Sequence, residues 1–180
     1  QRGLIPQAIP EIRGADLAPL ALELAAWGVQ DAETLAWLDP PPAASLAQAR
    51  DLLTELDALD EARRITDAGK ALAQLPLHPR LAHMLRAAET MQRGALACDI
   101  AALLSERDLY KGEARRSCDL AERVEVLQGF RRGGRKAAQA SGADANACQR
   151  IEQVARQWRR LIRAREDEAL SVDANEVAFV

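Results

Sequence analysis

Aromatic side chains make up only 3% of this 180-residue chain, so its core must be built from leucine, alanine, valine and isoleucine. No apolar run approaches the roughly eighteen residues that a membrane-spanning helix needs. The amino-terminal residues lack the order of charged, apolar and small residues that marks a secretory signal. Cys98, Cys118 and Cys148 are odd in number and widely spaced. This spacing favours reduced thiols over a disulfide frame or a zinc site, so we expect a cytoplasmic protein with no membrane segment.

The motifs of a self-contained enzyme are also missing. A phosphate-binding loop ends in Gly-Lys-Ser or Gly-Lys-Thr, but Gly69-Lys70-Ala71 lacks the hydroxyl and the leading glycine. His78 and His83 have no cysteine or carboxylate partners at metal-ligand spacing. We therefore expect no catalytic residue, no metal site and no cofactor site in this segment.

Charge is unevenly distributed along the chain. Residues 1–60 carry three basic and ten acidic groups, net −7, whereas residues 123–165 carry eleven basic and three acidic groups, net +8. Lysine accounts for three of the 24 basic residues, which leaves 24 − 3 = 21 arginines. The arginine excess reflects either a GC-rich genome or contact with RNA, because the planar guanidinium suits phosphates and stacked bases. A bound polyanion would meet the carboxy-terminal half.

Clustered arginines in that half are the sharpest candidate for a binding surface. We predict that nucleic-acid phosphates contact eight residues on a helix and a nearby basic loop: Arg131, Arg132, Arg135, Lys136, Arg156, Arg159, Arg160 and Arg163. Such contacts would make binding strongly salt-dependent. Reversal of the four helix arginines to glutamate is expected to weaken binding. The other interpretation is an ordinary solvated helix face.

Apolar spacing predicts helices along most of the chain. The expected helices are 11–27, 31–38, 45–56, a short one capped by Thr66 or Asp67, 79–93, 96–104, 119–130 and 144–162. Residues 58–66 look like two small strands, 105–118 like a loop, and 131–142 like a glycine-containing connection. Trp27, Trp37 and Trp158 lie on apolar stripes and are expected in the core. The predicted fold is mainly α, a winged-helix domain with a small β wing followed by an α-helical bundle.

Several motifs occur in order between residues 10 and 105. They are Pro10-Glu11-Ile12, Trp37-Leu38-Asp39-Pro40-Pro41, the leucine-rich run 49–59, Thr66 to Leu75, and Leu75-Pro76-Leu77-His78-Pro79-Arg80-Leu81-Ala82-His83-Met84-Leu85. Together they resemble the helicase-associated region of DEAH-box ATP-dependent RNA helicases. The Leu22-Glu23-Leu24 and Trp27-Gly28 pattern is similar to the bacterial HrpB branch. Residues 106–180 resemble the family only as a helical, basic continuation, and Asp57 stands where the common form has glycine.

This resemblance implies a lead-in at residues 1–10, a winged helix at 11–76 and a ratchet-like bundle at 77–180 that is cut off at its carboxy-terminal end. It implies motor domains ahead of Gln1 that bind ATP and Mg²⁺, so this fragment alone is not expected to hydrolyse ATP. The region would contact the motor domains, close the RNA channel and couple motor movement to strand translocation. The expected partner is single-stranded RNA, with DNA as the other candidate.

Two other readings of the chain stay open at this point. One is a stand-alone winged-helix module that binds nucleic acid or protein, which would require a basic recognition helix for duplex DNA. Residues 45–59 instead carry Asp51, Glu55 and Asp57 against Arg50, which disfavours duplex reading. The other is a pure scaffold, which a salt titration of RNA binding would distinguish.

Overall fold

The computed structural model describes residues 10–111 and 119–164, and within them the protein is mainly α-helical. The chain divides into two compact units, residues 1–83 (unit 1) and 84–180 (unit 2). The division falls inside helix α4, Pro79–Thr90, whereas the resemblance placed a boundary at residue 76. None of the helices in the described ranges is long and apolar enough to cross a membrane.

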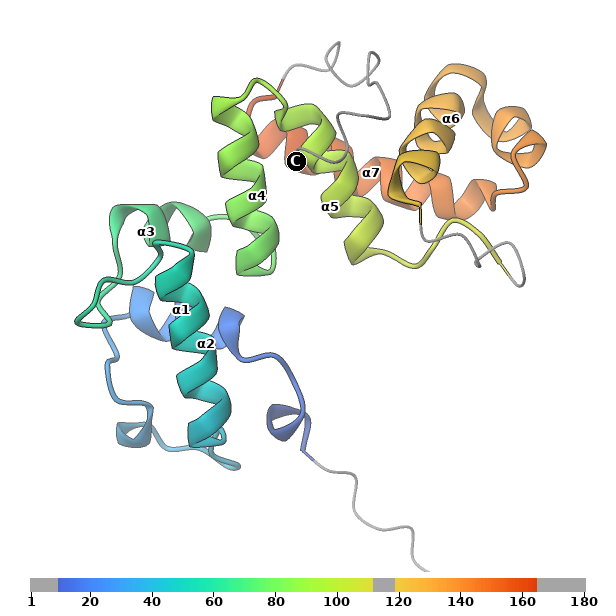
Figure 1. Cartoon of the computed structure of the whole chain (residues 1–180). Coiled ribbons are helices and arrows are strands. Elements are labelled where there is room, and N and C mark those ends of the chain that lie inside the picture. The colour runs from blue at the N-terminus through green and yellow to red at the C-terminus, as the bar shows by residue number, and fades with distance from the viewer. Residues whose placement is uncertain (1–9, 112–118, 165–180) are drawn as a thin grey trace, which may run out of the picture. The chain divides into compact units, whose positions relative to one another are not determined.

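Unit 1 is built on α1, Ala18–Ala26, which packs against α2, Ala43–Glu55, and α3, Asp67–Ala73 (Figure 1). Two 3-10 turns flank α1: η1, Glu11–Arg13, and η2, Ala32–Thr34. Gly28 follows α1 with φ of 79°, the left-handed conformation expected just beyond a helix end. The large side chains in the core of unit 1 are leucines, as expected from the low aromatic content. They are Leu17, Leu22, Leu24, Leu46, Leu53, Leu59, Leu72 and Leu75.

The start of α3 lies unusually close to the loop before it. The Thr66 hydroxyl caps α3 by accepting from the Gly69 amide at 2.9 Å, as predicted from the sequence. The Thr66 amide in turn donates to the Ala58 carbonyl at 3.0 Å. A Cβ at position 69 would stand 2.1 Å from that same carbonyl oxygen. Only glycine therefore fits at position 69 without displacing the backbone.

The predicted β wing is not present as two strands. Within the described residues, the segment contains a single antiparallel bridge between Leu59 and Ile65. A tight turn joins these residues, in which the Asp60 amide donates to the Arg64 carbonyl at 2.9 Å. The turn leaves too few residues on either side to extend a ladder. Asp57, just before it, has φ of 55°, which explains why glycine suits this position in the resembling family.

Unit 2 is built on α5, Gly94–Ser105, α6, Leu120–Ala140, and α7, Ala145–Leu161, which pack on one another (Figure 1). The predicted caps of α6 and α7 are confirmed: Asp119 accepts from the Ala121 amide and Asp144 from the Asn146 amide. The predicted connection over 131–142 is wrong. Helix continues to Ala140 and is broken only at Gly134, whose φ of 62° and ψ of −149° suit glycine alone.

The tryptophans have different environments. Trp158 is buried, so its predicted place in the core is confirmed. Trp37 is half-buried and its indole nitrogen donates to the Ala32 carbonyl at 2.7 Å. Trp27 is 74% exposed, and the core prediction for it is wrong. It is the C-cap residue of α1, beyond the last turn whose apolar stripe reaches the core.

Candidate nucleic-acid interface

Helix α7 has one buried face and one basic face. The buried face carries Ile151, Ala155 and Trp158. Arg156 and Arg160 are exposed and four residues apart, so they lie on one side of α7, and Arg163 is exposed two residues beyond the end of the helix. The position of the last two near the carboxy-terminal end of α7 also suits the helix dipole.

A second group of exposed cations surrounds the break in α6. Arg132, Arg135 and Lys136 are exposed on either side of Gly134. The Arg135 guanidinium donates to the Asn146 side-chain oxygen at 2.7 Å, which ties the second part of α6 to the start of α7. We call these six side chains the exposed basic set: Arg132, Arg135, Lys136, Arg156, Arg160 and Arg163.

The other two predicted contact residues point into unit 2. Arg131 and Arg159 form, with Asp99 of α5 and Glu152 of α7, what we call the buried ion cluster. Arg131 grips both Asp99 carboxylate oxygens, each at 2.6 Å, and its Nε donates to Glu152 at 2.5 Å. Arg159 donates to Asp99 at 2.5 Å and to Glu152 at 2.8 Å. The side chains of Arg131 and Arg159 are only 10% and 4% exposed.

Desolvation and pairing oppose each other in this cluster. Burial raises the pKa of Asp99 above its ordinary value, while the guanidiniums of Arg131 and Arg159 act in the opposite direction. Burial by itself would lower the pKa of Arg131, but the hydrogen bonds and charges of Asp99 and Glu152 raise it instead. The two buried cations and two anions balance, which is how such charges are tolerated in an interior, and the half-exposed Arg156 adds a longer contact to Glu152 at 3.5 Å from the surface.

The eight predicted contact residues thus separate into two sets. Six are on the surface of α6 and α7, where phosphates could reach them, and RNA contact by them stays a prediction. The guanidiniums of Arg131 and Arg159 are instead engaged with Asp99 and Glu152. A charge reversal at Arg159 would therefore change the stability of unit 2, and it would not report on RNA contact at the surface.

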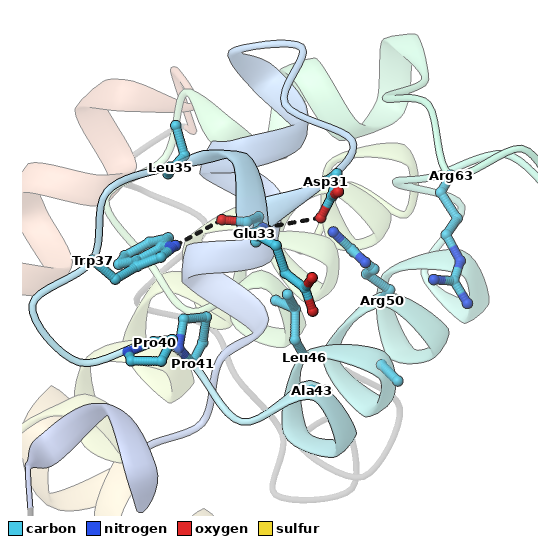
Figure 2. Close-up of a pocket in the computed structure, with 12 residues that line it drawn as sticks. Asp31, Glu33, Leu35, Trp37, Pro40, Pro41, Ala43, Leu46, Arg50 and Arg63 are labelled. Atoms are coloured by element: carbon cyan, nitrogen blue, oxygen red, sulfur yellow. Dashed lines mark hydrogen bonds between the residues drawn. The ribbon is translucent and has the colours of Figure 1, made fainter.

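Unit 1 contains a pocket of about 630 Å³ between η2, the proline run and α2. Figure 2 shows Trp37, Pro40 and Pro41 on one side of it and Arg50 and Arg63 on the other. Next to Trp37, the Leu38 side chain is fully exposed. Apolar surface with a few charges at its rim is typical of a site that contacts another polypeptide.

The histidine and cysteine side chains of the described ranges bear on whether this part of the chain meets the requirements of a metal or catalytic site. No group of three histidine, cysteine or acidic residues there could hold a metal ion. His78 contacts the Asp16 carboxylate at 3.1 Å. Cys98 is buried, and burial raises the pKa of its thiol to about 12, so it is neutral at physiological pH.

Part of the chain matches the model of a known domain, and more of it is similar to known proteins. Residues 49–77 match the helicase-associated domain (HA2), winged-helix, which covers the end of α2, the turn and α3. The chain is 43% identical over 100 residues to the ATP-dependent RNA helicase HrpB of Escherichia coli strain K12, covering 56% of this chain and 12% of that protein. It is 34% identical over 113 residues to the probable ATP-dependent RNA helicase DHX35 of Homo sapiens, covering 59% of this chain and 15% of that one.

Two solved structures of HrpB are also similar to this chain. A crystal structure of the E. coli DExH-box NTPase HrpB matches with a TM-score of 0.60 and 30% identity, over 88% of this chain and 16% of that one. A second, of the E. coli DEAH/RHA helicase HrpB, matches with a TM-score of 0.62 and 30% identity, over 88% and 17%.

Residues 49–77 thus match the winged-helix part of the helicase-associated domain, and the chain is similar over more than half of its length to ATP-dependent RNA helicases. The chain is similar to E. coli HrpB in both sequence and structure. The chain spans only 12% to 15% of the length of the two relatives named above.

Proposed function

We propose that this chain is the accessory part of a cytoplasmic ATP-dependent RNA helicase, and that it binds single-stranded RNA through the exposed basic set. The observation that carries the proposal is the presence of six exposed cations on α6, on α7 and just beyond the end of α7, in a chain similar to RNA helicases. Cationic side chains track a single-stranded backbone without reading its sequence. Such a surface holds a strand while the rest of the enzyme moves.

The remaining parts of the proposal concern coupling. ATP and Mg²⁺ would bind in motor domains outside residues 1–180, and hydrolysis there would supply the movement. Unit 1 would contact those domains, and unit 2 would close the RNA channel, so that opening and closing of the motor moves the strand past α6 and α7. Support comes from the helicase relatives and from the exposed apolar surface next to the pocket.

Charge reversal on the exposed basic set tests the RNA proposal. The triple variant Arg132→Glu, Lys136→Glu, Arg160→Glu is expected to bind single-stranded RNA about tenfold or more weakly. Three lost phosphate contacts should also reduce the slope of log affinity against log salt by about 2. Fluorescence anisotropy with a labelled oligouridylate at several salt concentrations measures both quantities.

The matched control carries the same change in net charge elsewhere. Arg13, Arg63 and Arg107 are exposed, and reversing all three to glutamate should leave the salt slope unchanged. Equal weakening by both triple variants would mean that net charge alone governs binding. That result would count against a defined RNA surface on α6 and α7.

Leu38 tests the contact with motor domains. Its side chain is 100% exposed, so Leu38→Asp should alter the stability of unit 1 by less than about 0.5 kcal/mol. If this surface meets a motor domain, the same change should weaken association about tenfold, because a buried apolar contact is replaced by a desolvated charge. Calorimetric titration against the motor portion of E. coli HrpB measures the affinity. Leu104→Asp, at a leucine of unit 2 that is 58% exposed, is the control, and equal losses would contradict the assignment.

The stand-alone winged-helix module remains the second candidate, but one observation disfavours it. The exposed side chains of α2 include Asp51 and Glu55, and α3 begins with the exposed Asp67. These acids would repel the backbone of a DNA duplex. The acidic surface of α2 and α3 is better suited to contact with a protein than with DNA.

A further inference from the structure

The buried ion cluster joins all three main helices of unit 2 at one point. Asp99 comes from α5, Arg131 from α6, and Glu152 and Arg159 from α7. Arg131 binds residues on both of the other helices, with Asp99 at 2.6 Å and Glu152 at 2.5 Å. It directly precedes the exposed Arg132 and lies one turn before the break at Gly134.

Few apolar contacts hold this part of α6. The buried residues of the helix are Val124, Val126, Leu127 and Gln128, and then only Ala138. Residues 129–137 contain no fully buried residue, yet the side chain of Arg131 is only 10% exposed. The inward contacts of this segment include the fork of Arg131 on Asp99 and the half-buried Phe130 beside it, and of these the fork is the directional one.

The kind of contact matters because apolar burial has no direction. A guanidinium that grips both oxygens of a carboxylate fixes the rotation of its helix more narrowly than leucine packing does. Buried ion pairs can often be replaced by apolar side chains with no loss of stability, so stability alone does not account for the cluster. Since the cluster is neutral, it adds little long-range attraction for RNA by itself.

Because α6 is broken at Gly134, the rotation of the helix before the break decides how its exposed cation lies relative to those after the break. Arg132 precedes the break, and Arg135 and Lys136 follow it. The last part of α6 is held by Ala138 in the core and by the bond from Arg135 to Asn146. If Arg131 were released, the last turn before the break, residues 129–133, could shift relative to the part after it. The three cations would then no longer face one backbone.

We propose that Arg131, held by Asp99 and Glu152, is a positioning residue that sets the exposed cations around Gly134 in register for successive RNA phosphates. This inference rests on the proposed function of the exposed basic set. Arg131 itself touches no RNA in this arrangement. Its effect is exerted through Arg132, Arg135 and Lys136.

An apolar replacement of the whole cluster separates positioning from stability. The variant Asp99→Leu, Arg131→Met, Glu152→Leu, Arg159→Met removes two positive and two negative charges, so the net charge is unchanged. We expect a folded protein whose thermal midpoint is not lower, binding a labelled oligouridylate about tenfold more weakly. The slope of log affinity against log salt should fall by about 1 to 2 as two or three phosphate contacts are lost. A folded variant with unchanged affinity and slope would overturn the inference.

Arg131→Lys provides a second variant that keeps the charge and loses the fork. It should bind RNA with a reduced salt slope, while Arg123→Lys should not change the slope. Arg123 is the matched control because it lies in the first part of α6, where apolar contacts hold the helix, and it also binds a carboxylate, that of Asp108. Equal slopes for the two lysine variants would overturn the positioning role. Absence of RNA binding by the unaltered chain would overturn the proposed function itself, which distinguishes the two failures.

Discussion

Replacement of Asp99 by alanine is expected to lower the free energy of unfolding of unit 2 by about 3–5 kcal/mol. Asp99 is fully buried and accepts hydrogen bonds from both Arg131 and Arg159. Its removal would leave two interior guanidiniums with Glu152 as the remaining partner in the cluster. The loss is large because the unpaired charge must either stay desolvated or force the helices apart.

Native-state hydrogen exchange of the α5 and α7 amides measures this loss without interference from unit 1. Asp108→Ala is the control, since Asp108 forms a similar pair with Arg123 nearer the surface. That substitution should cost on the order of 1 kcal/mol. An Asp99 variant no less stable than the Asp108 variant would contradict the structural role of the buried ion cluster.

Replacement of Gly69 by alanine is expected to destabilise unit 1 by about 3 kcal/mol, the upper end for an overpacked site. The added methyl would stand 2.1 Å from the Ala58 carbonyl oxygen and 2.8 Å from a side-chain carbon of Ile65. The first of these is a backbone atom that cannot rotate away. Relief would require α3 to move, which would weaken the bond from the Thr66 amide to Ala58.

Hydrogen exchange of the α1 and α2 amides tests this expectation, with Gly14→Ala as the control. A Cβ at position 14 meets nothing within 4 Å, and the backbone φ there is −121°, which alanine adopts freely. That variant should be neutral or slightly stabilising, by up to about 1 kcal/mol. Equal stability of the two glycine variants would contradict the close approach of α3 to the turn.

The longer helices after residue 43 were largely predictable because their signals are local, whereas the helix expected over 31–38 is only the 3-10 turn Ala32–Thr34. Thr66, Asp119 and Asp144 each precede an apolar-periodic segment, and each caps a helix within one or two residues of the predicted start. The course of α6 past residue 131 was not predictable from local preference. Two adjacent glycines indicate a loop, but the fork of Arg131 and the burial of Ala138 keep the chain helical on both sides of Gly134.

Whether an arginine lies on the exposed basic face or in the buried ion cluster depends on contacts with residues distant in sequence. Arg159 adjoins other arginines, so the sequence predicts it on the basic face, but it binds Asp99, sixty positions earlier. The sequence does indicate a buried ion pair at Asp99, because this residue is a lone acid in the apolar run from Gly94 to Leu104. A charge in a helix that is apolar all round must be buried with a cation. Which cation would meet it could be learned only from the packing of α5 on α6 and α7.

The most direct test of the central claim, that α6 and α7 hold a single-stranded RNA backbone, is a salt titration of oligouridylate binding by the unaltered chain. Contacts from the six residues of the exposed basic set predict a slope of log affinity against log salt of about −4, at roughly −0.7 per contact. A slope near zero, or no measurable binding at low salt, would contradict the account.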